Sequence, residues 1–220
     1  MTDQITPSTQ VHHVEVAIAG AGFGGLCMAI KLQEAGITDF VILEKGDDVG
    51  GTWRDNQYPG AACDVQSHMY SLSFAPKTNW SKRYAPWNEI QDYILDTARQ
   101  FSLDARTRFH AEVVSADYQP QTARWLLTLR DGSQVDCRVF VLASGPLHVP
   151  SIPRLKGIES FEGSVFHSAQ WNHDLDLTGK NVVSIGTGGS AIQYVPEIAP
   201  QVKQLYVLQR TAAWVIPRAE

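Results

Sequence analysis

The chain has 220 residues, of which 44% are hydrophobic and 19% charged, with a formal net charge of −5. This composition is typical of a globular protein of one or two domains, and it excludes a chain too polar to bury a core. No run of Lys and Arg predicts nucleic-acid binding, and no apolar stretch is long enough to cross a membrane. Three widely spaced cysteines without a metal-ligand pattern favour a reduced, cytoplasmic protein: Cys27, Cys63 and Cys137.

The chain opens with a predicted β-α-β unit. An apolar strand at residues 14–19 leads into the sequence GAGFGG at residues 20–25, which is followed by a helical pattern. A second strand at residues 40–43 ends at Glu44, 24 positions (44 − 20) after Gly20. A glycine turn lets the backbone approach a pyrophosphate at a helix N-terminus, and a carboxylate in this place accepts hydrogen bonds from a ribose diol. The unit therefore predicts an FAD or NAD site.

A loop-rich segment follows and contains the sequence GGTWRDNQYPGAACD at residues 50–64. Its glycines allow close backbone approach to a ligand. Trp53 and Tyr58 are candidates to wall a flat ring, and Asp64 is a candidate to bind a ribityl hydroxyl or a cation. The alternative is a structured loop with Trp53 in a core, and composition alone favours that alternative.

A helix is predicted next, with its N-cap at Asn88. Its buried face is expected to carry apolar residues at helical spacing: Ile90, Ile94, Ala98 and Phe101. An antiparallel meander is then predicted from alternating apolar residues, with strands at residues 109–118, 125–129 and 135–143. The continuous apolar run at residues 139–142 is typical of a strand in a buried parallel sheet.

A second glycine-rich turn closes the chain. The strand at residues 182–185 leads into GTGGSA at residues 186–191, and the strand at residues 205–209 ends at Arg210, 24 positions (210 − 186) after Gly186. The planar fork of an arginine matches a 2′-phosphate. This second unit therefore predicts NADP.

The segment between the two units has the sequence FEGSVFHSAQW at residues 161–171. Considered alone, His167 is more often a structural histidine than a functional one, and the aromatic residues around it usually pack.

Together these segments resemble the amino-terminal part of a type I Baeyer–Villiger monooxygenase, within the flavin-containing monooxygenase superfamily. The resemblance covers residues 14–218 and depends on both glycine turns, the GGTWxxxxYPGxxxD loop and the FxGxxxHxxxW sequence. Trp171 favours the Baeyer–Villiger branch. Asn172 departs from the family pattern, which usually has Pro or Asp there.

The resemblance implies an α/β fold: a Rossmann-like FAD-binding domain at residues 1–148, a linker at 149–179, and the start of a Rossmann-like NADP-binding domain at 180–220. It also implies that NADPH reduces FAD, that the reduced flavin takes up O₂ as a C4a-peroxide, and that this species converts a ketone into an ester or lactone. Asp64 and His167 would be the catalytic residues on this chain.

The resemblance assigns cofactor roles residue by residue. Residues implied for FAD are Gly20, Gly22, Phe23, Gly24, Gly25, Glu44, Lys45, Gly51, Thr52, Trp53, Asp64, Tyr70 and Val113. Residues implied for NADP are Gly186, Thr187, Gly188, Gly189, Ser190, Ala191, Arg210 and Thr211.

Members of this family are longer, so we expect the chain to be part of a larger enzyme that needs a carboxy-terminal half, and the family's catalytic arginine to lie beyond Glu220. Two alternatives stay open. One is a flavin monooxygenase that oxygenates sulfur or nitrogen, and the other is a cofactor-binding fragment without catalytic activity.

Overall fold

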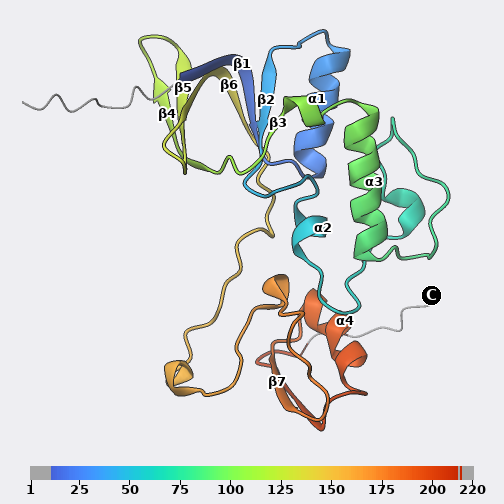
Figure 1. Ribbon diagram of the computed structural model, residues 1–220. Coiled ribbons are helices and arrows are strands. Elements are labelled where there is room, and N and C mark those ends of the chain that lie inside the picture. Colours follow the sequence, from blue (N-terminus) through green and yellow to red (C-terminus); the bar gives the residue numbers. More distant parts are fainter. Residues whose placement is uncertain (1–10, 213, 215–220) are drawn as a thin grey trace, which may run out of the picture. The chain divides into compact units, whose positions relative to one another are not determined.

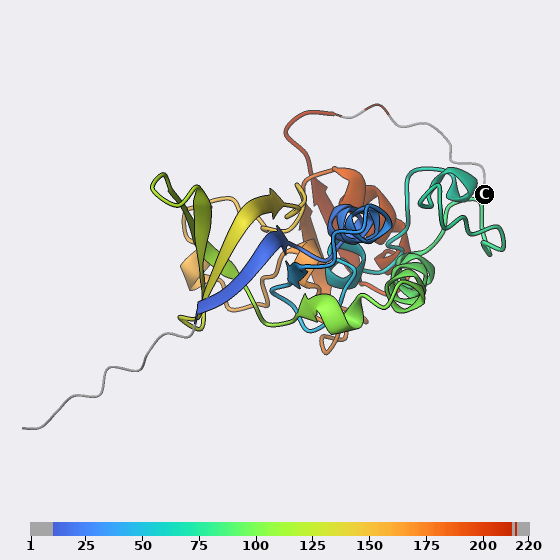
Figure 2. The ribbon, with the colours of Figure 1, turned by 90° about the horizontal axis from the view of Figure 1, so that it is seen from above.

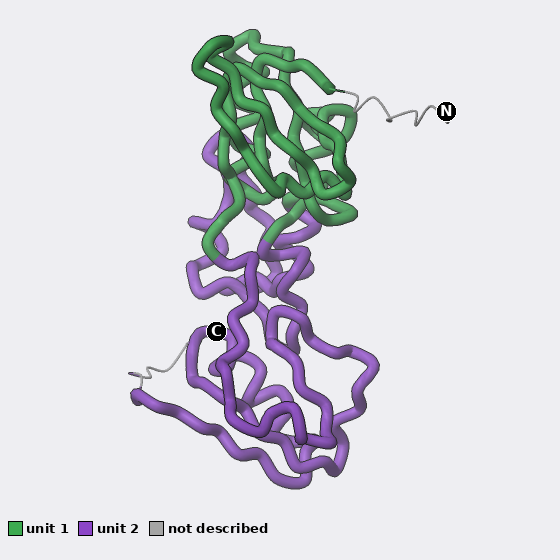
Figure 3. Tube along the Cα trace, turned by 90° about the vertical axis from the view of Figure 1, so that its left-hand side faces the viewer, with its two compact units in different colours: residues 1–51, 94–146 green, residues 52–93, 147–220 purple. Residues whose placement is uncertain are grey.

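A computed structural model describes residues 11–212 and 214. The chain divides into two compact units (Figure 3). Unit 1 holds residues 1–51 and 94–146, and unit 2 holds residues 52–93 and 147–220. The outer ends of the expected first and last domains, at residues 1–10 and 215–220, lie outside the described residues.

Unit 1 is built on one mixed six-stranded sheet with the order β3-β2-β1-β6-β5-β4 (Figure 1). Its strands are β1 (Val11–Ala19), β2 (Phe40–Leu43), β3 (Thr107–Arg108), β4 (Val113–Gln119), β5 (Arg124–Leu129) and β6 (Gln134–Leu142). Strands β3, β2, β1 and β6 run parallel to one another, whereas β5 pairs antiparallel with both β6 and β4. The predicted meander is therefore confirmed, although its first strand begins at residue 113 rather than 109, and β6 joins it to the parallel part of the sheet as the run at residues 139–142 predicts.

Helix α1 (Phe23–Glu34) packs on β1 and β2 (Figure 1 and Figure 2). Its buried residues are Gly25, Leu26, Ala29 and Ile30. At the helix end Gly36 adopts a φ of +78°, a conformation that glycine reaches without strain.

Helix α3 (Trp87–Gln100) begins one residue before the predicted cap. The Ile90 amide donates to the Pro86 oxygen, so Pro86 precedes the first turn and Asn88 lies exposed within it. The predicted cap at Asn88 is therefore wrong, because the proline fixes the start of the helix. The predicted apolar face is confirmed for Ile90, Ile94 and Ala98, which are buried, whereas Phe101 follows the end of the helix and is half-buried.

One buried cluster of unit 1 joins residues of β1 and β2 to the meander, and it contains Val14, Ala17, Leu43, Ala111, Leu127, Leu129, Val135 and Cys137. The carboxyl end of β6 behaves differently from the prediction. Val139 is 48% exposed and Leu142 is 71% exposed. The run at residues 139–142 does pair in parallel with β1, but the described residues do not cover it on both faces.

Unit 2 contains a parallel pair of strands, β7 (Asn181–Ile185) and β8 (Gln204–Leu208), joined by α4 (Gly189–Ile198). A short helix α2 (Thr52–Asp55) and three 3₁₀ helices, η1 (Ser67–Met69), η3 (Ile158–Ser160) and η4 (Ser168–Gln170), lie in its longer loops. The 3₁₀ helix η2 (Asp104–Arg106) belongs to unit 1. The second predicted β-α-β unit is confirmed within one residue at each strand end.

No helix among the described residues is long and apolar enough to cross a membrane. Within that same part of the chain, His, Cys, Asp and Glu side chains form no cluster of three or more that could hold a metal ion. The three cysteines are free thiols, with Cys63 and Cys137 buried.

Candidate dinucleotide-binding sites

The first glycine turn connects β1 to α1 and is tightly packed. Gly20 adopts a φ of +106°, and its amide donates to the Leu43 oxygen at 2.8 Å. A Cβ on Gly25 would lie 1.8 Å from the Gly20 oxygen, and a Cβ on Gly20 would lie 2.5 Å from the Ala143 oxygen. Both positions therefore require glycine, because backbone atoms occupy the space of a side chain.

Glu44 follows β2 and is only 3% exposed. Its Oε2 accepts from the Ala21 amide and its Oε1 from the Gly46 amide, each at 2.8 Å. The carboxylate thus ties the end of the second strand to the glycine turn. A carboxylate at the end of the second strand is the group that the sequence predicts to accept hydrogen bonds from a ribose diol.

A second loop of unit 1, which contains Gly50 and Gly51, contacts this turn through its backbone. The Gly50 amide donates to the Ala21 oxygen at 2.9 Å. A Cβ on Gly51 would lie 3.2 Å from the Gly22 Cα, so the two glycines face each other across a surface without side chains. Such a surface fits a pyrophosphate that must lie close to backbone N–H groups.

The second glycine turn, in unit 2, repeats the geometry of the first. Gly186 has a φ of +103°, and its amide donates to the Leu208 oxygen at 2.8 Å. Gly22 and Gly188 precede α1 and α4 with φ values of −82° and −78°. Neither helix has a side-chain cap or an acidic residue in its first turn, so no carboxylate of that turn competes for the positive end of the helix.

Arg210 lies two residues after β8 with an exposed side chain, and Thr211 beside it is also exposed. The predicted strand end was Gln209, one residue later than observed. An exposed guanidinium at this end of the strand can reach a phosphate on a bound ribose without first breaking internal packing.

In unit 2, the structure brings together two of the residues predicted to hold FAD. The Trp53 indole N–H donates to the Tyr70 hydroxyl at 3.1 Å, and the two rings meet edge to face with centroids 5.7 Å apart. Burial raises the pKa of Tyr70, the Trp53 hydrogen bond opposes this rise, and electrostatic interactions with Cys63 and Asp64 add to it. Asp64 itself is exposed.

Tyr58 does not stand as an open wall for a flat ring. It is 8% exposed, its ring packs edge to face on Tyr194, and its hydroxyl donates to Gln193 Oε1 at 2.9 Å. Both partners lie on α4, so this tyrosine serves packing within unit 2. The hypothesis that Tyr58 walls a ring is therefore wrong.

His167 caps a 3₁₀ turn. Its Nδ1 accepts from the Ala169 amide at 3.1 Å, which leaves Nε2 as the ring nitrogen that can donate a hydrogen bond. Trp171, at the end of the same turn, packs between Phe166 and Tyr194, with ring centroids 5.2 and 5.3 Å away. The segment around His167 thus contacts α4 through Trp171.

The remaining predicted site residues occupy varied positions. Within unit 1, Phe23 and Gly24 begin α1, Lys45 is exposed after Glu44, and Val113 is the first residue of β4. Within unit 2, the residues not described above begin a helix or precede one: Thr52 in α2, Thr187 before α4, and Gly189, Ser190 and Ala191 in its first turn.

Residues 13–220 match the family described as FMO-like, flavin-binding monooxygenase-like. The chain belongs to this family. It is 50% identical over 213 residues to a Baeyer–Villiger monooxygenase of Streptomyces coelicolor, a match that covers 96% of this chain and 41% of that protein.

Solved structures agree with this membership. A steroid monooxygenase bound to NADP is 40% identical, with a TM-score of 0.87, over 94% of this chain and 41% of that one. The OTEMO complex with FAD and NADP is 36% identical, with a TM-score of 0.86, over 91% of this chain and 39% of that one. The chain therefore spans about two fifths of the length of the relatives that it matches.

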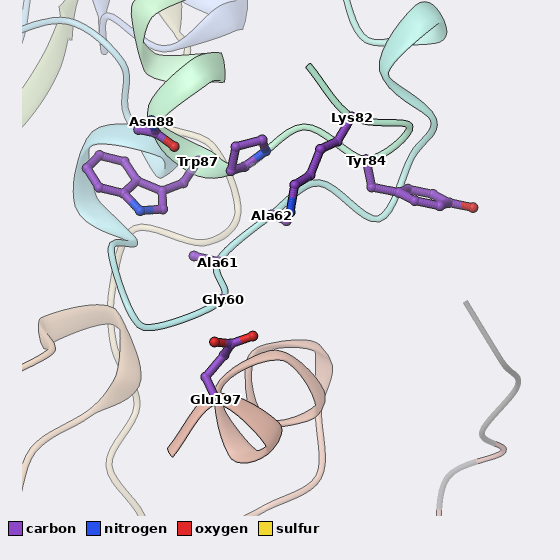
Figure 4. A pocket seen from close by; sticks show the side chains of 9 residues that line it. Gly60, Ala61, Ala62, Lys82, Tyr84, Trp87, Asn88 and Glu197 are labelled. Atoms are coloured by element: carbon purple, nitrogen blue, oxygen red, sulfur yellow. The ribbon is translucent and has the colours of Figure 1, made fainter. Parts of the chain in front are cut away.

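This family member also has a small pocket within unit 2, of about 200 Å³ (Figure 4). Its lining residues are Gly60, Ala61, Ala62, Lys82, Tyr84, Pro86, Trp87, Asn88 and Glu197. Ligand pockets usually exceed about 300 Å³, so this one is too small for a dinucleotide and we assign it no ligand.

Gln193 and Tyr194 are not among the predicted site residues, although both contact predicted site segments from α4. No local signal could have found them, because a glutamine and a tyrosine in an amphipathic helix predict only a polar or half-buried face.

Proposed function

We propose that the chain is the amino-terminal part of an FAD- and NADPH-dependent Baeyer–Villiger monooxygenase. The whole protein would insert one oxygen atom of O₂ next to a ketone carbonyl and release an ester or lactone. Residues 1–148 would form a Rossmann-like FAD-binding domain, residues 149–179 a linker, and residues 180–220 the start of a Rossmann-like NADP-binding domain.

The observation that supports this proposal most strongly is the repeated turn. Two glycine turns have nearly the same φ values, +106° and +103°, but one is followed by the buried carboxylate of Glu44 and the other by the exposed guanidinium of Arg210. A carboxylate suits a free ribose diol, and an arginine suits a 2′-phosphate. A relative's structure that holds both FAD and NADP supports the same division.

The residues of the first turn fit FAD. Gly22 and Gly51 pack closely through their backbones, so neither places a side chain between the turn and a pyrophosphate, whose charge the N-terminus of α1 would stabilise. Glu44, held by two backbone amides, would orient the ribose. When bound, the flavin supplies the activation of O₂ after reduction by NADPH, which is chemistry that no side chain can provide.

Other side chains of this chain would position the cofactors and supply hydrogen-bond donors and acceptors to them. Burial raises the pKa of Tyr70 further above its ordinary value of 10.0, so the hydroxyl stays a hydrogen-bond donor, and Trp53 holds it in place. The exposed carboxylate of Asp64 is available to a cationic partner, which the family pattern predicts to be an arginine. His167 would present its Nε2–H as a hydrogen-bond donor to a bound cofactor.

Arg210→Ala tests the assignment of the second turn. The lost charge-assisted bonds to the 2′-phosphate should weaken NADPH binding by about 10- to 100-fold and leave NADH binding nearly unchanged. The measurement is a fluorescence titration of the protein with each nucleotide.

Lys203→Ala is the matched control, because it removes one positive charge from unit 2 just before β8 rather than after it. Equal weakening of NADPH and NADH in Arg210→Ala would overturn the assignment to a 2′-phosphate. Conversion of a ketone to an ester by the whole protein, rather than of a sulfide to a sulfoxide alone, would separate this function from that of a sulfur-oxygenating relative.

A further inference from the structure

The side chain of Gln193 fastens residues 58–64 to helix α4. Its Nε2 donates to the Ala62 oxygen at 2.9 Å, and its Oε1 accepts from the Ala62 amide at 3.3 Å. The same Oε1 also accepts from the Tyr58 hydroxyl at 2.9 Å. One side-chain amide thus pairs with both backbone groups of a loop residue, in the way that a neighbouring strand would.

The backbone of the loop lies directly against the helix at the same place. Gly60 adopts a φ of +73°, and a Cβ on it would lie 2.8 Å from both the Gln193 oxygen and the Glu197 Cγ. Figure 4 shows Gly60, Ala61 and Ala62 passing the helix that carries Glu197. Residues 58–62 therefore cannot shift toward α4, and the hydrogen bonds of Gln193 oppose a shift away from it.

Gln193 also lies close to the second glycine turn along the helix. It is four residues after Gly189, the first residue of α4, so the two positions lie on the same face one turn apart. At the other end of the contact, Asp64 follows Ala62 by two residues. Gln193 is thus placed between the turn assigned to NADP and the segment that carries a predicted catalytic carboxylate.

We propose that Gln193 is a positioning residue that couples NADP binding at the second glycine turn to residues 58–64. This inference rests on the proposed function only in the assignment of NADP to that turn. A dinucleotide that stabilises the first turn of α4 also restrains Gln193, which makes the three hydrogen bonds to Tyr58 and Ala62. The Ala62 amide then opens less often, and the carboxylate two residues later is held in a narrower range of positions.

Hydrogen exchange of the full chain, with and without NADP⁺, tests the coupling. In the wild type, NADP⁺ should slow exchange by about three- to tenfold in residues 186–194 and also in residues 58–64. In Gln193→Leu, NADP⁺ should slow exchange only in residues 186–194. A purely structural role would protect residues 58–64 equally with and without nucleotide, so the NADP⁺-dependent difference is the deciding quantity.

Three further variants keep the test decisive if Gln193→Leu fails to fold. Gln193→Glu retains the acceptor and loses the donor to Ala62, and Tyr58→Phe retains the buried ring and loses one hydrogen bond. Both should reduce the NADP⁺-dependent slowing in residues 58–64 without abolishing it. Glu197→Gln, on the same helix and against the same glycine, should leave the slowing at its wild-type value.

The outcomes separate the two proposals. If NADP⁺ slows exchange in residues 186–194 but not in residues 58–64 of the wild type, or if Gln193→Leu retains both effects, the coupling is overturned while the NADP assignment stands. If NADP⁺ slows exchange in neither segment, the assignment of NADP to the second turn fails, and the coupling fails with it.

Discussion

The two glycine turns share a backbone conformation but differ in how closely other atoms surround them. In the first turn, a Cβ on Gly20 or Gly25 would overlap with backbone oxygens 2.5 and 1.8 Å away. In the second turn, a Cβ on Gly186 or Gly188 would meet no described atom within 4 Å. Glycine is therefore required for packing in the first turn, whereas in the second its positive φ at Gly186 is the main requirement.

The sixth position of each turn shows the consequence. Gly25 occupies it in the first turn, where α1 approaches the Gly20 oxygen too closely for any side chain. Ala191 occupies it in the second turn, where a methyl group fits and is buried. The same sequence motif thus describes a helix held tightly against its strand in unit 1 and one held more loosely in unit 2. The glycine motif therefore predicts the path of the backbone, but it does not predict how closely other atoms pack around that backbone.

Gly25→Ala should give the largest effect and tests the tight packing directly. Its methyl group cannot be accommodated 1.8 Å from a backbone oxygen without moving α1, so we expect a loss of at least about 3 kcal/mol in the free energy of unfolding. Gly189→Ala is the control in the second turn, with an expected change within about 1 kcal/mol because the space is open. Urea unfolding of both variants provides the measurement, and similar losses would contradict the contrast.

Glu44→Ala should give the next largest effect. It removes the acceptor of two backbone amides in a site that is nearly closed to water, at a cost of about 2 to 5 kcal/mol. Arg210→Ala, at the corresponding place in unit 2, should change the free energy of unfolding by less than about 0.5 kcal/mol because its side chain is exposed. Chemical denaturation without nucleotide measures both. Equal losses in the free energy of unfolding would show that the side chains at the two strand ends contribute equally to stability, and would contradict this prediction.

The smallest predicted effect concerns the sheet behind the first turn. Cys137 on β6 is fully buried, and burial raises the pKa of its thiol from 9.0 to about 11. The unfolded chain ionises this thiol first. The contribution of the un-ionised Cys137 thiol to the free energy of unfolding is therefore complete below about pH 9. As the pH rises toward 11 this contribution is lost, and the free energy of unfolding falls by about 2 to 3 kcal/mol.

The measurement for this prediction is the free energy of unfolding between pH 8 and 11, where Cys137→Ala should show a shallower decline than the wild type. Cys27→Ala, which replaces a half-buried thiol on α1, serves as the control. A decline that is the same in wild type and Cys137→Ala would mean that the interior of this sheet admits water.

Much of the fold could be predicted from local patterns. The β-α-β units follow from apolar runs, glycine turns and helical periodicity, which are properties of adjacent residues. The start of α3 could not be placed in this way, because Pro86 and the capping candidate Asn88 compete within three residues and the proline prevails. The exposure of Leu142 was also missed, since burial depends on what other segments cover a strand.

The candidate sites, like the fold, could be predicted only in part from the sequence. The position of Glu44 at a strand end was predicted from spacing, but its bonds to Ala21 and Gly46 depend on the folded turn. The contacts of Gln193 join residues more than 130 positions apart, and no periodicity in a single sequence records them. Sequence patterns therefore located the turns, whereas the connections between segments became visible only in three dimensions.

The matched turns also provide the protein with two built-in spectroscopic reporters. The amides of Gly20 and Gly186 each donate to a strand carbonyl over the same 2.8 Å, from glycines of nearly equal φ. In a ¹⁵N-labelled sample, each resonance would respond mainly to a ligand at its own turn. A single titration series could then reveal the order in which two different nucleotides load, with each turn serving as the internal reference for the other.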